Sequence, residues 1–404
     1  MRALLVNPWI YDFKAFDFWN KPLGLLIVAR LLKQAGFEVQ LIDNLDRSSP
    51  YFQTPTRTDI YGRGKYYYEV VDKPKPYKKI PRYYKRYGIP EKVFIELLNQ
   101  IEPPDLIFVT SSMTYWYQGV FHTIRLLKEK FPRTRIILGG IYATLCKEHA
   151  RRYSGADIIF SGSAEDGLLE VISELGYPVD VKPHSFILPD FALYKNLNYG
   201  VILTNRLVLE QLRFFNRRCS NIAFFDDALL YNKNFPALLK EIISGDFKLN
   251  FHTSNGLHCR YIDKELARLM LEANFKTIYL SLETTNPIVQ KQTGGKVDTQ
   301  EFLDAVEILK ATGFQKEQIH TYILYGMPGQ GYEEIIDSIK LCHKLGIHPH
   351  LCEFSPIPFT AEYKRTGFDE ETDPLYHNNL FYTWFYPEYK EKLYTRIKTL
   401  LSRG

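Results

Sequence analysis

Short apolar segments alternate with amphipathic helical segments along most of this chain, and this alternation constrains the fold more than any other feature. Five segments of residues 1–185 have the length and composition of buried strands, namely ALLVNP (3–8), FEVQLID (37–43), DLIFVTSS (105–112), RIILGG (135–140) and ADIIFSG (156–162). The segments between them, such as GLLIVARLLKQAG (24–36), place apolar residues at helical spacing and end at glycine or proline. Strands that alternate with helices predict an α/β domain with a doubly wound, Rossmann-like parallel sheet.

A second series of strands follows a short linker that holds Pro183 and Pro189. Its six strand candidates are YGVILT (199–204), NIAFF (221–225), KLNFH (248–252), TIYLSL (277–282), TYILY (321–325) and HLCEF (350–354). Six βα units predict a partial (β/α)6 barrel, with any site formed by the loops that follow the strands. We therefore predict domains at residues 1–185 and 186–365, and an aromatic, helical extension at residues 366–404 that covers the barrel's open side or closes its mouth.

The composition is that of a globular protein, with 45% hydrophobic and 24% charged residues, and argues against wholesale disorder. A formal net charge of +5 permits an anionic ligand and does not require nucleic acid as a partner. Five scattered cysteines argue against a disulfide framework and fit a reducing compartment. The sequence has no run of 18 apolar residues and no signal-peptide pattern after Met1, so we expect a cytoplasmic protein with no membrane partner.

A basic, tyrosine-rich insertion at residues 57–90 interrupts the first series of strands. Within it, residues 62–88 carry about nine Lys and Arg residues interleaved with tyrosines. Such a segment is typical of an RNA-binding surface or of a lid. We favour a second interpretation, in which the tyrosines pack onto the domain and the charges are solvated.

Candidate ligand-binding residues stand where the strands of the first series end, because ligands of doubly wound sheets bind at the carboxyl ends of the strands. These residues are Thr110 and Ser111, Gly139 and Gly140, and Glu165 in the segment that follows Gly162. Hydroxyl groups can bond the polar edge of a ligand, and glycines let the backbone approach it closely. The chain has no G-x-G-x-x-G motif here, which argues against a nicotinamide cofactor.

The ends of the second series are also rich in polar groups. The candidates are Asp226 and Asp227, Asn255 between Ser254 and Gly256, Ser281 and Glu283, Gly326, and Pro356. Together they predict a polar pocket at one rim of the barrel. Asp263 and Thr299 are interpreted as helix N-caps, whereas acids beside an apolar strand, such as Asp226, Asp227 and Glu283, are costly to bury without partners.

In their order and spacing these segments resemble those of radical SAM proteins with a cobalamin-binding domain. The resemblance rests in the first half on NP (7–8), residues 22–43, VTSSMTYW (109–116), GG (139–140) and GSAEDGLLE (162–170). In the second half it rests on NIAFFDDALL (221–230), FHTSNGLH (251–258), LSLETT (280–285), TGGK (293–296), YILYGMPGQGYEE (322–334) and SPIPFT (355–360).

The resemblance implies two small-molecule cofactors. Cobalamin would be held by Thr110, Ser111, Gly139, Gly140 and Glu165, with no histidine ligand to cobalt because the D-x-H-x-x-G motif is missing. S-adenosylmethionine (SAM) would be held at the barrel rim, with Asp226 and Asp227 near its amino group, Ser281 and Glu283 near its ribose and carboxylate, and Gly326 and Pro356 beside the adenine. Asn255 belongs to the same predicted rim, and no residue of this chain is predicted as a metal ligand.

The sequence departs from the family at the feature that starts its chemistry. Radical SAM enzymes hold a 4Fe-4S cluster by three thiolates from a C-x-x-x-C-x-x-C loop after the first barrel strand. Here that strand ends YGVILTNR (199–206) and passes directly into a helical segment, so the loop is missing. Only Cys259 and Cys352 are placed to reach the pocket, and two thiolates are too few. Phe359 also stands where a glycine is usual, and Ser163-Ala164 replaces the usual turn before Glu165.

Two hypotheses for the function follow. The first is an enzyme that cleaves SAM reductively, for radical chemistry or methyl transfer on an unknown substrate, with its cluster loop missing from this chain. The second is a non-catalytic relative that binds cobalamin or SAM as a carrier or sensor. A third, less favoured hypothesis makes the basic insertion an RNA-binding element.

Overall fold

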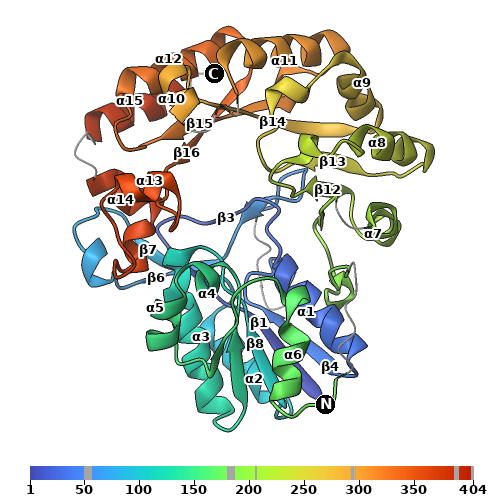
Figure 1. Cartoon of the computed structure of the whole chain (residues 1–404), viewed down its shortest axis with the longest axis vertical. Coiled ribbons are helices and arrows are strands. Elements are labelled where there is room, and N and C mark those ends of the chain that lie inside the picture. Colours follow the sequence, from blue (N-terminus) through green and yellow to red (C-terminus); the bar gives the residue numbers. More distant parts are fainter. Residues whose placement is uncertain are drawn as a thin grey trace. The chain divides into compact units, whose positions relative to one another are not determined.

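The computed structural model describes residues 1–49, 57–179, 187–204, 207–292, 295, 297–385 and 391–401 (Figure 1). The chain forms two compact units, unit 1 from Met1–Leu197 and Pro356–Phe381, and unit 2 from Asn198–Ser355 and Tyr382–Gly404. These units reflect packing, whereas the predicted domains at 1–185, 186–365 and 366–404 reflect sequence motifs. Those domain limits stay a prediction; residues 185 and 186, like Pro183 of the predicted linker, lie outside the described part of the chain.

Unit 1 is built around a five-stranded parallel sheet. Its strands are β1 (Arg2–Asn7), β4 (Glu38–Asp43), β8 (Leu106–Val109), β9 (Arg135–Leu138) and β10 (Ile158–Ile159), in the order β10-β9-β8-β1-β4. The register places Asn7 opposite Asp43 and Val6 opposite Val109, so that the carboxyl ends of the strands share one edge. The strand order reverses between β1 and β8, where ligands of doubly wound sheets bind.

Helices bury both faces of this sheet, which explains why its strands read as continuous apolar runs. The helices are α1 (Leu23–Gln34), α2 (Glu91–Asn99), α3 (Tyr117–Lys130), α4 (Ile141–Leu145), α5 (Lys147–Tyr153) and α6 (Leu168–Glu174). Alternate strand residues, such as Leu5, Phe108 and Ile137, form one core with α1 and α6. The predicted doubly wound sheet is therefore confirmed.

The basic insertion forms local β structure. Strands β2 (Ile10–Asp12), β7 (Tyr84–Tyr87) and β6 (Tyr68–Val71) make an antiparallel sheet, and β3 (Phe16–Asp17) pairs with β5 (Gly64–Lys65). Four tyrosines of the insertion are buried, namely Tyr66, Tyr77, Tyr84 and Tyr87. These four tyrosines pack onto the domain as in the favoured interpretation, whereas Tyr67, Tyr68 and Tyr83 are exposed, and the RNA-binding interpretation stays an untested prediction.

The segment after Pro356 completes unit 1. It contains α13 (Ala361–Arg365) and a 3₁₀ turn at Pro374–His377. The Asn378 side chain donates to the buried Asp12 carboxylate (2.9 Å), and the Tyr77 hydroxyl donates to the carbonyl of Leu375 (2.7 Å). Helix α14 (Asn379–Phe385) then crosses the division between the two units.

Unit 2 contains a six-stranded parallel sheet whose strands follow one another in chain order. The strands are β11 (Gly200–Ile202), β12 (Asn221–Phe224), β13 (Asn250–Thr253), β14 (Phe275–Glu283), β15 (Ile319–Tyr325) and β16 (His348–Glu353). The connecting helices are α7 (Val208–Phe215), α8 (Phe235–Ser244), α9 (Lys264–Glu272), α10 (Pro287–Gln292), α11 (Thr299–Thr312) and α12 (Tyr332–Lys344), and α15 (Glu391–Leu401) packs against α12. Figure 1 shows helices along one side of this sheet. The predicted partial (β/α)6 barrel is confirmed, with all six strands at the expected positions.

The two predicted N-caps have different outcomes. Asp263 caps α9, because its carboxylate accepts from the backbone N–H of Leu266 (2.7 Å). Thr299 was the wrong residue: Asp298 caps α11 and accepts from the N–H of Glu301 (2.8 Å), whose own carboxylate completes a capping box. No helix in the described ranges has both the length and the apolar character needed to cross a membrane.

Candidate functional site

The loops that follow β8 and β9 are joined by the side chain of Ser111. Its buried hydroxyl donates to the carbonyl of Gly139 (2.6 Å) and accepts from the backbone N–H of Ala143 in α4 (3.2 Å). The backbone carbonyl of Ser111 accepts from Ile141 (2.9 Å). Ser111 lies at the predicted rim, and its hydroxyl joins the two loops of unit 1 through these bonds; its role toward a ligand stays a prediction.

Gly140 is required by the close approach of the same two loops. Its φ is +93° and its ψ is −170°, a conformation almost restricted to glycine. A Cβ at this position would lie 2.2 Å from the carbonyl oxygen of Ser111. At Gly139 the nearest atom to an added Cβ would be 3.8 Å away, so that glycine has no such role.

Thr144 extends the joined loops to the end of β10. Its hydroxyl donates to the carbonyl of Gly140 (2.9 Å) and accepts from the N–H of Gly162 (3.2 Å). Glu165 follows in a 3₁₀ turn, and the hydroxyl of Ser163 accepts from its N–H (3.4 Å). The unusual Ser163 therefore has a structural use as the cap of the turn that carries Glu165.

Thr110 is the predicted rim residue best placed for a ligand. It follows β8 next to β1, where the strand order reverses, and its N–H donates to the carbonyl of Val6 (3.2 Å). Its side chain is half-buried, and no described residue bonds its hydroxyl. A hydroxyl without a protein partner at this point can donate to the polar edge of a bound molecule.

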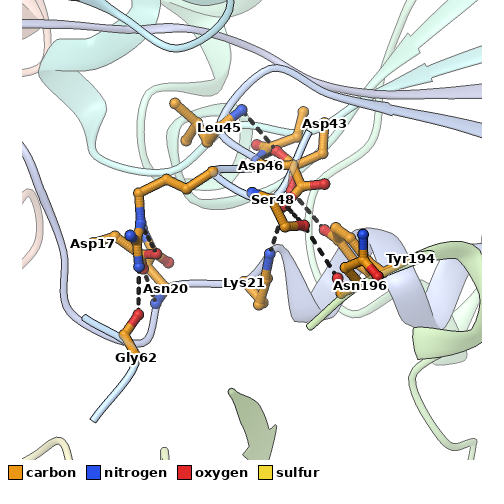
Figure 2. A network of polar contacts seen from close by, with 12 residues as sticks. Asp17, Asn20, Lys21, Asp43, Leu45, Asp46, Ser48, Gly62, Tyr194 and Asn196 are labelled. Carbon is orange, nitrogen blue, oxygen red and sulfur yellow. Dashed lines mark hydrogen bonds and ion pairs between the residues drawn. The ribbon is translucent and has the colours of Figure 1, made fainter. Parts of the chain in front are cut away.

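On the other side of β1, a polar network occupies the end of β4 (Figure 2). The buried carboxylate of Asp43 accepts from the Asn7 amide (2.7 Å), the N–H of Leu45 (2.9 Å) and the hydroxyl of Tyr194 (2.6 Å). Burial raises the pKa of Asp43, and the positive charge of Lys21 opposes part of the shift. This part of the edge is filled by the protein itself, so a ligand is expected on the β8 side.

Sequence reasoning missed two cations of the network. Lys21 lies 3.5 Å from the Asp46 carboxylate and 4.2 Å above the ring of Tyr194. Arg47 is 1% exposed and pairs with Asp17 (2.7 Å). Most partners of Lys21 and Arg47 lie 25 or more residues away in the sequence. No local sequence pattern therefore indicates that these two cations belong to the network.

In unit 2, the Asp226 carboxylate is engaged at the end of the neighbouring strand. It accepts from the backbone N–H of Thr204 (3.0 and 3.1 Å) and from the Thr204 hydroxyl (2.7 Å). Burial raises the pKa of Asp226, and the hydrogen bonds from Thr204 oppose part of this shift. Asp226, predicted to lie near the amino group of SAM, thus accepts hydrogen bonds that join its loop to the end of β11. Asn205 and Arg206, which follow β11, lie outside the described residues.

Asp227 and Asn255 are brought together. The Asn255 amide donates to the Asp227 carboxylate (3.1 Å) and to the carbonyl of Phe225 (3.2 Å). Asp227 is exposed, while Asn255 is half-buried between β13 and β14. The pair forms part of a polar rim that continues at Ser281.

Ser281 and Glu283 lie where the pairing of β14 with β15 is irregular. The register shifts between these two residues, and Glu283 has a φ of +63°, which strains a residue other than glycine. A Cβ added at Gly256 would lie 2.3 Å from the Ser281 hydroxyl, so the loop after β13 packs directly on this strand. No described residue bonds the half-buried Glu283 carboxylate, which leaves it available to a ligand.

Gly326 is held by a residue that the sequence analysis did not single out. The buried Gln330 side chain accepts from the N–H of Gly326 (2.9 Å) and Met327 (3.3 Å) and donates to the carbonyl of Leu324 (3.0 Å). The Gly326 N–H is therefore already paired. Pro356 begins the segment that packs in unit 1.

The cysteines do not fit a three-thiolate cluster. No cysteine follows β11 directly in the sequence: Cys219, the first after this strand, precedes β12, while Cys146 belongs to unit 1 and Cys342 is buried in α12. Cys259 is buried after β13, and Cys352 lies in β16. Of the residues that the structure describes, no group of three or more His, Cys, Asp and Glu side chains is arranged to hold a metal ion.

The comparisons with known proteins agree with this architecture. Residues 184–342 match the family model of the radical SAM superfamily. No curated protein matches the chain in sequence.

Two solved structures share the fold. The radical S-adenosylmethionine methyltransferase TsrM from Kitasatospora setae, solved with a tryptophan substrate and a SAM analogue, has a TM-score of 0.62 and 14% identity over 87% of this chain and 72% of TsrM. The cobalamin-dependent S-adenosylmethionine radical enzyme OxsB has a TM-score of 0.54 and 12% identity over 100% of this chain and 56% of OxsB. At these identities the likeness concerns the fold alone.

The resemblance inferred from the sequence is thus supported by a family match in the barrel and by the fold of both units. The doubly wound sheet precedes the partial barrel in the chain, as the motifs predicted. Residues 184–342 thus match the radical SAM superfamily model, and the chain shares the fold of two solved structures, TsrM and OxsB.

Proposed function

We propose that this chain is a cofactor-binding protein with a radical SAM fold that binds SAM at the rim of unit 2 and does not itself cleave it. The observation that carries the proposal is the set of hydrogen bonds that Thr204 donates to the carboxylate of Asp226. It fastens the end of β11, which in the family leads into the cluster loop, in a sequence that has no three-cysteine motif. The chain would then act as a carrier or sensor of its cofactor.

The SAM site is proposed at the rim formed after β12, β13 and β14. Glu283 provides a carboxylate that no residue of the described ranges bonds, suited to a hydroxyl or ammonium group of the ligand. Asn255 and Asp227 form the adjacent polar wall, and Ser281 supports the packing of the loop at Gly256. Asp226 is expected to stabilise this rim rather than to contact SAM.

Cobalamin binding is proposed at the edge of the sheet in unit 1. Thr110 supplies the available hydroxyl, and the loops joined by Ser111, Gly140 and Thr144 form the supporting surface. When bound, cobalamin would supply a cobalt centre able to carry a methyl group. A cytoplasmic location and the lack of a membrane partner stay predictions of the sequence, and RNA stays the less favoured partner.

The test begins with anaerobic reconstitution with iron and sulfide, followed by ultraviolet–visible spectroscopy. SAM and cobalamin binding are then measured by calorimetry, and 5′-deoxyadenosine is assayed under reduction. We expect binding of SAM, no iron–sulfur absorbance and no 5′-deoxyadenosine. Stoichiometric iron with 5′-deoxyadenosine formation would contradict the proposal and support the alternative, an active radical SAM enzyme whose cluster is held by other ligands.

Matched variants locate the two sites. Glu283→Gln should weaken SAM about tenfold, because it removes one charge-assisted hydrogen bond. Glu272→Gln, at an exposed position of α9, is the control and should leave SAM affinity unchanged. Thr110→Val should weaken the binding of cobalamin and leave the affinity for SAM unchanged. Unchanged SAM affinity in Glu283→Gln would place the ligand elsewhere.

A further inference from the structure

Unit 1 contains a cavity of about 330 Å³ that the motifs did not indicate. One wall comes from the end of α4 and the start of α5, and the other from residues 358–377. The two walls are far apart in the sequence, and both belong to unit 1. The volume is that of an ordinary small-molecule site.

The wall from residues 358–377 is largely aromatic. Tyr363, Phe368 and His377 contact one another, with ring centroids 5.4 to 6.4 Å apart. Pro358 and Pro374 add apolar surface, and both are buried. Such a wall favours a flat ring, which stacks on aromatic side chains.

Phe359 is held at the same cavity in a strained conformation. Its φ is +71° and its side chain is 68% exposed, although this position in the motif is usually glycine. In the ligand-free protein, an exposed phenylalanine with a positive φ is stabilised neither by burial of its ring nor by a favourable backbone conformation. Strain of this kind persists at ligand-binding sites, where a ligand covers the ring.

The opposite wall supplies a hydrogen-bond donor. The Nδ1 atom of His149 lies 2.7 Å from the hydroxyl of Tyr142, and no described residue bonds Nε2. A phenol donates to imidazole better than it accepts from it, so the proton of the neutral ring is expected on Nε2. Burial lowers the pKa of His149, which keeps the ring neutral, and burial raises the pKa of the neighbouring Cys146 thiol to about 12.

The charges around the cavity are nearly balanced. Lys147 and Lys364 are exposed at its edge, opposite Glu148, Asp369 and Glu370. Glu148 pairs with an arginine of its own helix (2.8 Å), and Asp369 accepts from the N–H of residue 371 in its own turn (3.1 Å). Neither sign of charge dominates, so the cavity suits an uncharged ligand.

We propose that this cavity binds an uncharged, flat heteroaromatic molecule, which stacks against Phe359, Tyr363 and Phe368 and accepts a hydrogen bond from Nε2 of His149. The site shares Thr144 with the loops proposed to support cobalamin and includes none of the residues proposed to contact SAM. It does not depend on the function proposed above.

Quinoline is a suitable probe, because it is flat, uncharged at pH 8 and has one acceptor nitrogen. The rate of Cys146 alkylation by N-ethylmaleimide is followed by peptide mass spectrometry, with and without quinoline. We expect saturable protection of Cys146 and none of Cys219 or Cys352, the half-buried thiols of unit 2. Naphthalene, which has the same flat two-ring shape and no charge but lacks the acceptor, should protect about threefold to tenfold less well. Equal protection by both compounds, or none by quinoline, would overturn the proposal.

Variants separate binding from folding. Tyr142→Phe keeps His149 but no longer fixes its proton on Nε2, so it should weaken quinoline binding slightly. Adding His149→Phe removes the donor without leaving a buried hydroxyl unpaired. The double variant should weaken quinoline about threefold to tenfold, the range of one neutral hydrogen bond. Phe359→Gly should weaken quinoline and raise the unfolding midpoint. A rise in stability with unchanged binding would exclude the aromatic contact.

Discussion

Replacing Gly140 with alanine should destabilise unit 1 more than any other single glycine change at the rim. The backbone conformation, with φ +93° and ψ −170°, disfavours alanine by about 1–3 kcal/mol. The added Cβ would also lie 2.2 Å and 2.6 Å from backbone atoms of Ser111, and relieving such overpacking costs about 1–3 kcal/mol. We therefore expect a loss of about 2–6 kcal/mol in the free energy of unfolding.

Two neighbouring glycines separate the two effects. Gly162 has a φ of +108° and no atom within 4 Å of an added Cβ, so its alanine variant should lose only the backbone part, about 1–3 kcal/mol. Gly139 has neither a positive φ nor a close neighbour, and its alanine variant should be as stable as the parent or more stable by about 0.4–1 kcal/mol.

Urea unfolding followed by tryptophan fluorescence suits this series. Trp9, Trp19 and Trp116 belong to unit 1, and Trp384 belongs to unit 2, so the signal reports mainly on unit 1. Unfolding free energies are compared at equal slope of the transition. If Gly140→Ala came within about 0.5 kcal/mol of Gly139→Ala, the close packing of the two loops would be wrong.

Three further outcomes are expected. Arg47→Ala should lower the free energy of unfolding by about 3–5 kcal/mol, because it removes the cation that balances the charge of the buried Asp17 carboxylate. The double variant Arg47→Met with Asp17→Leu should recover most of this loss in urea titrations. Burial raises the pKa of Asp226 in the folded state and so disfavours its charged form. The free energy of unfolding of the parent, relative to that of Asp226→Asn, should therefore fall as the pH rises through that pKa. If the two free energies differed by the same amount at acid and neutral pH, the burial of Asp226 would be contradicted. Because burial raises the pKa of Cys146 to about 12, its alkylation rate should increase about tenfold per pH unit between pH 7 and 10, and a plateau below pH 9 would show an exposed thiol.

Sequence periodicity was sufficient for the framework of both units. The six strands of unit 2 occupy the expected positions because buried strands of a parallel sheet are short apolar runs bounded by polar loops. The fifth strand of unit 1 is shorter than its apolar run: only Ile158–Ile159 pair as a strand, although the N–H of Phe160 still donates to the carbonyl of Leu138 (2.8 Å). The cap of α11 shows a similar limit, since Asp298 and Thr299 are adjacent and equally suited in composition.

The roles of the candidate site residues were harder to predict. Ser111 and Asp226 have the residue types that a cofactor site needs, yet each is used to join two loops of the protein. The same chemistry serves both purposes, and only the positions of distant partners decide between them. The cavity of unit 1 was not predicted, because it forms where residues 358–377 return to α4 and α5.

The return of residues 356–381 to unit 1 has a consequence for synthesis of the protein. When residue 197 has left the ribosome, the carboxylate of Asp12 still lacks the amide of Asn378, and Thr114 lacks the imidazole of His377, 3.0 Å away in the finished chain. Unit 1 therefore cannot finish folding until the ribosome has synthesised all six strands of unit 2. A chain that ends after Leu197 should therefore remain bound to chaperones, whereas supplying residues 356–381 as a separate peptide should release it.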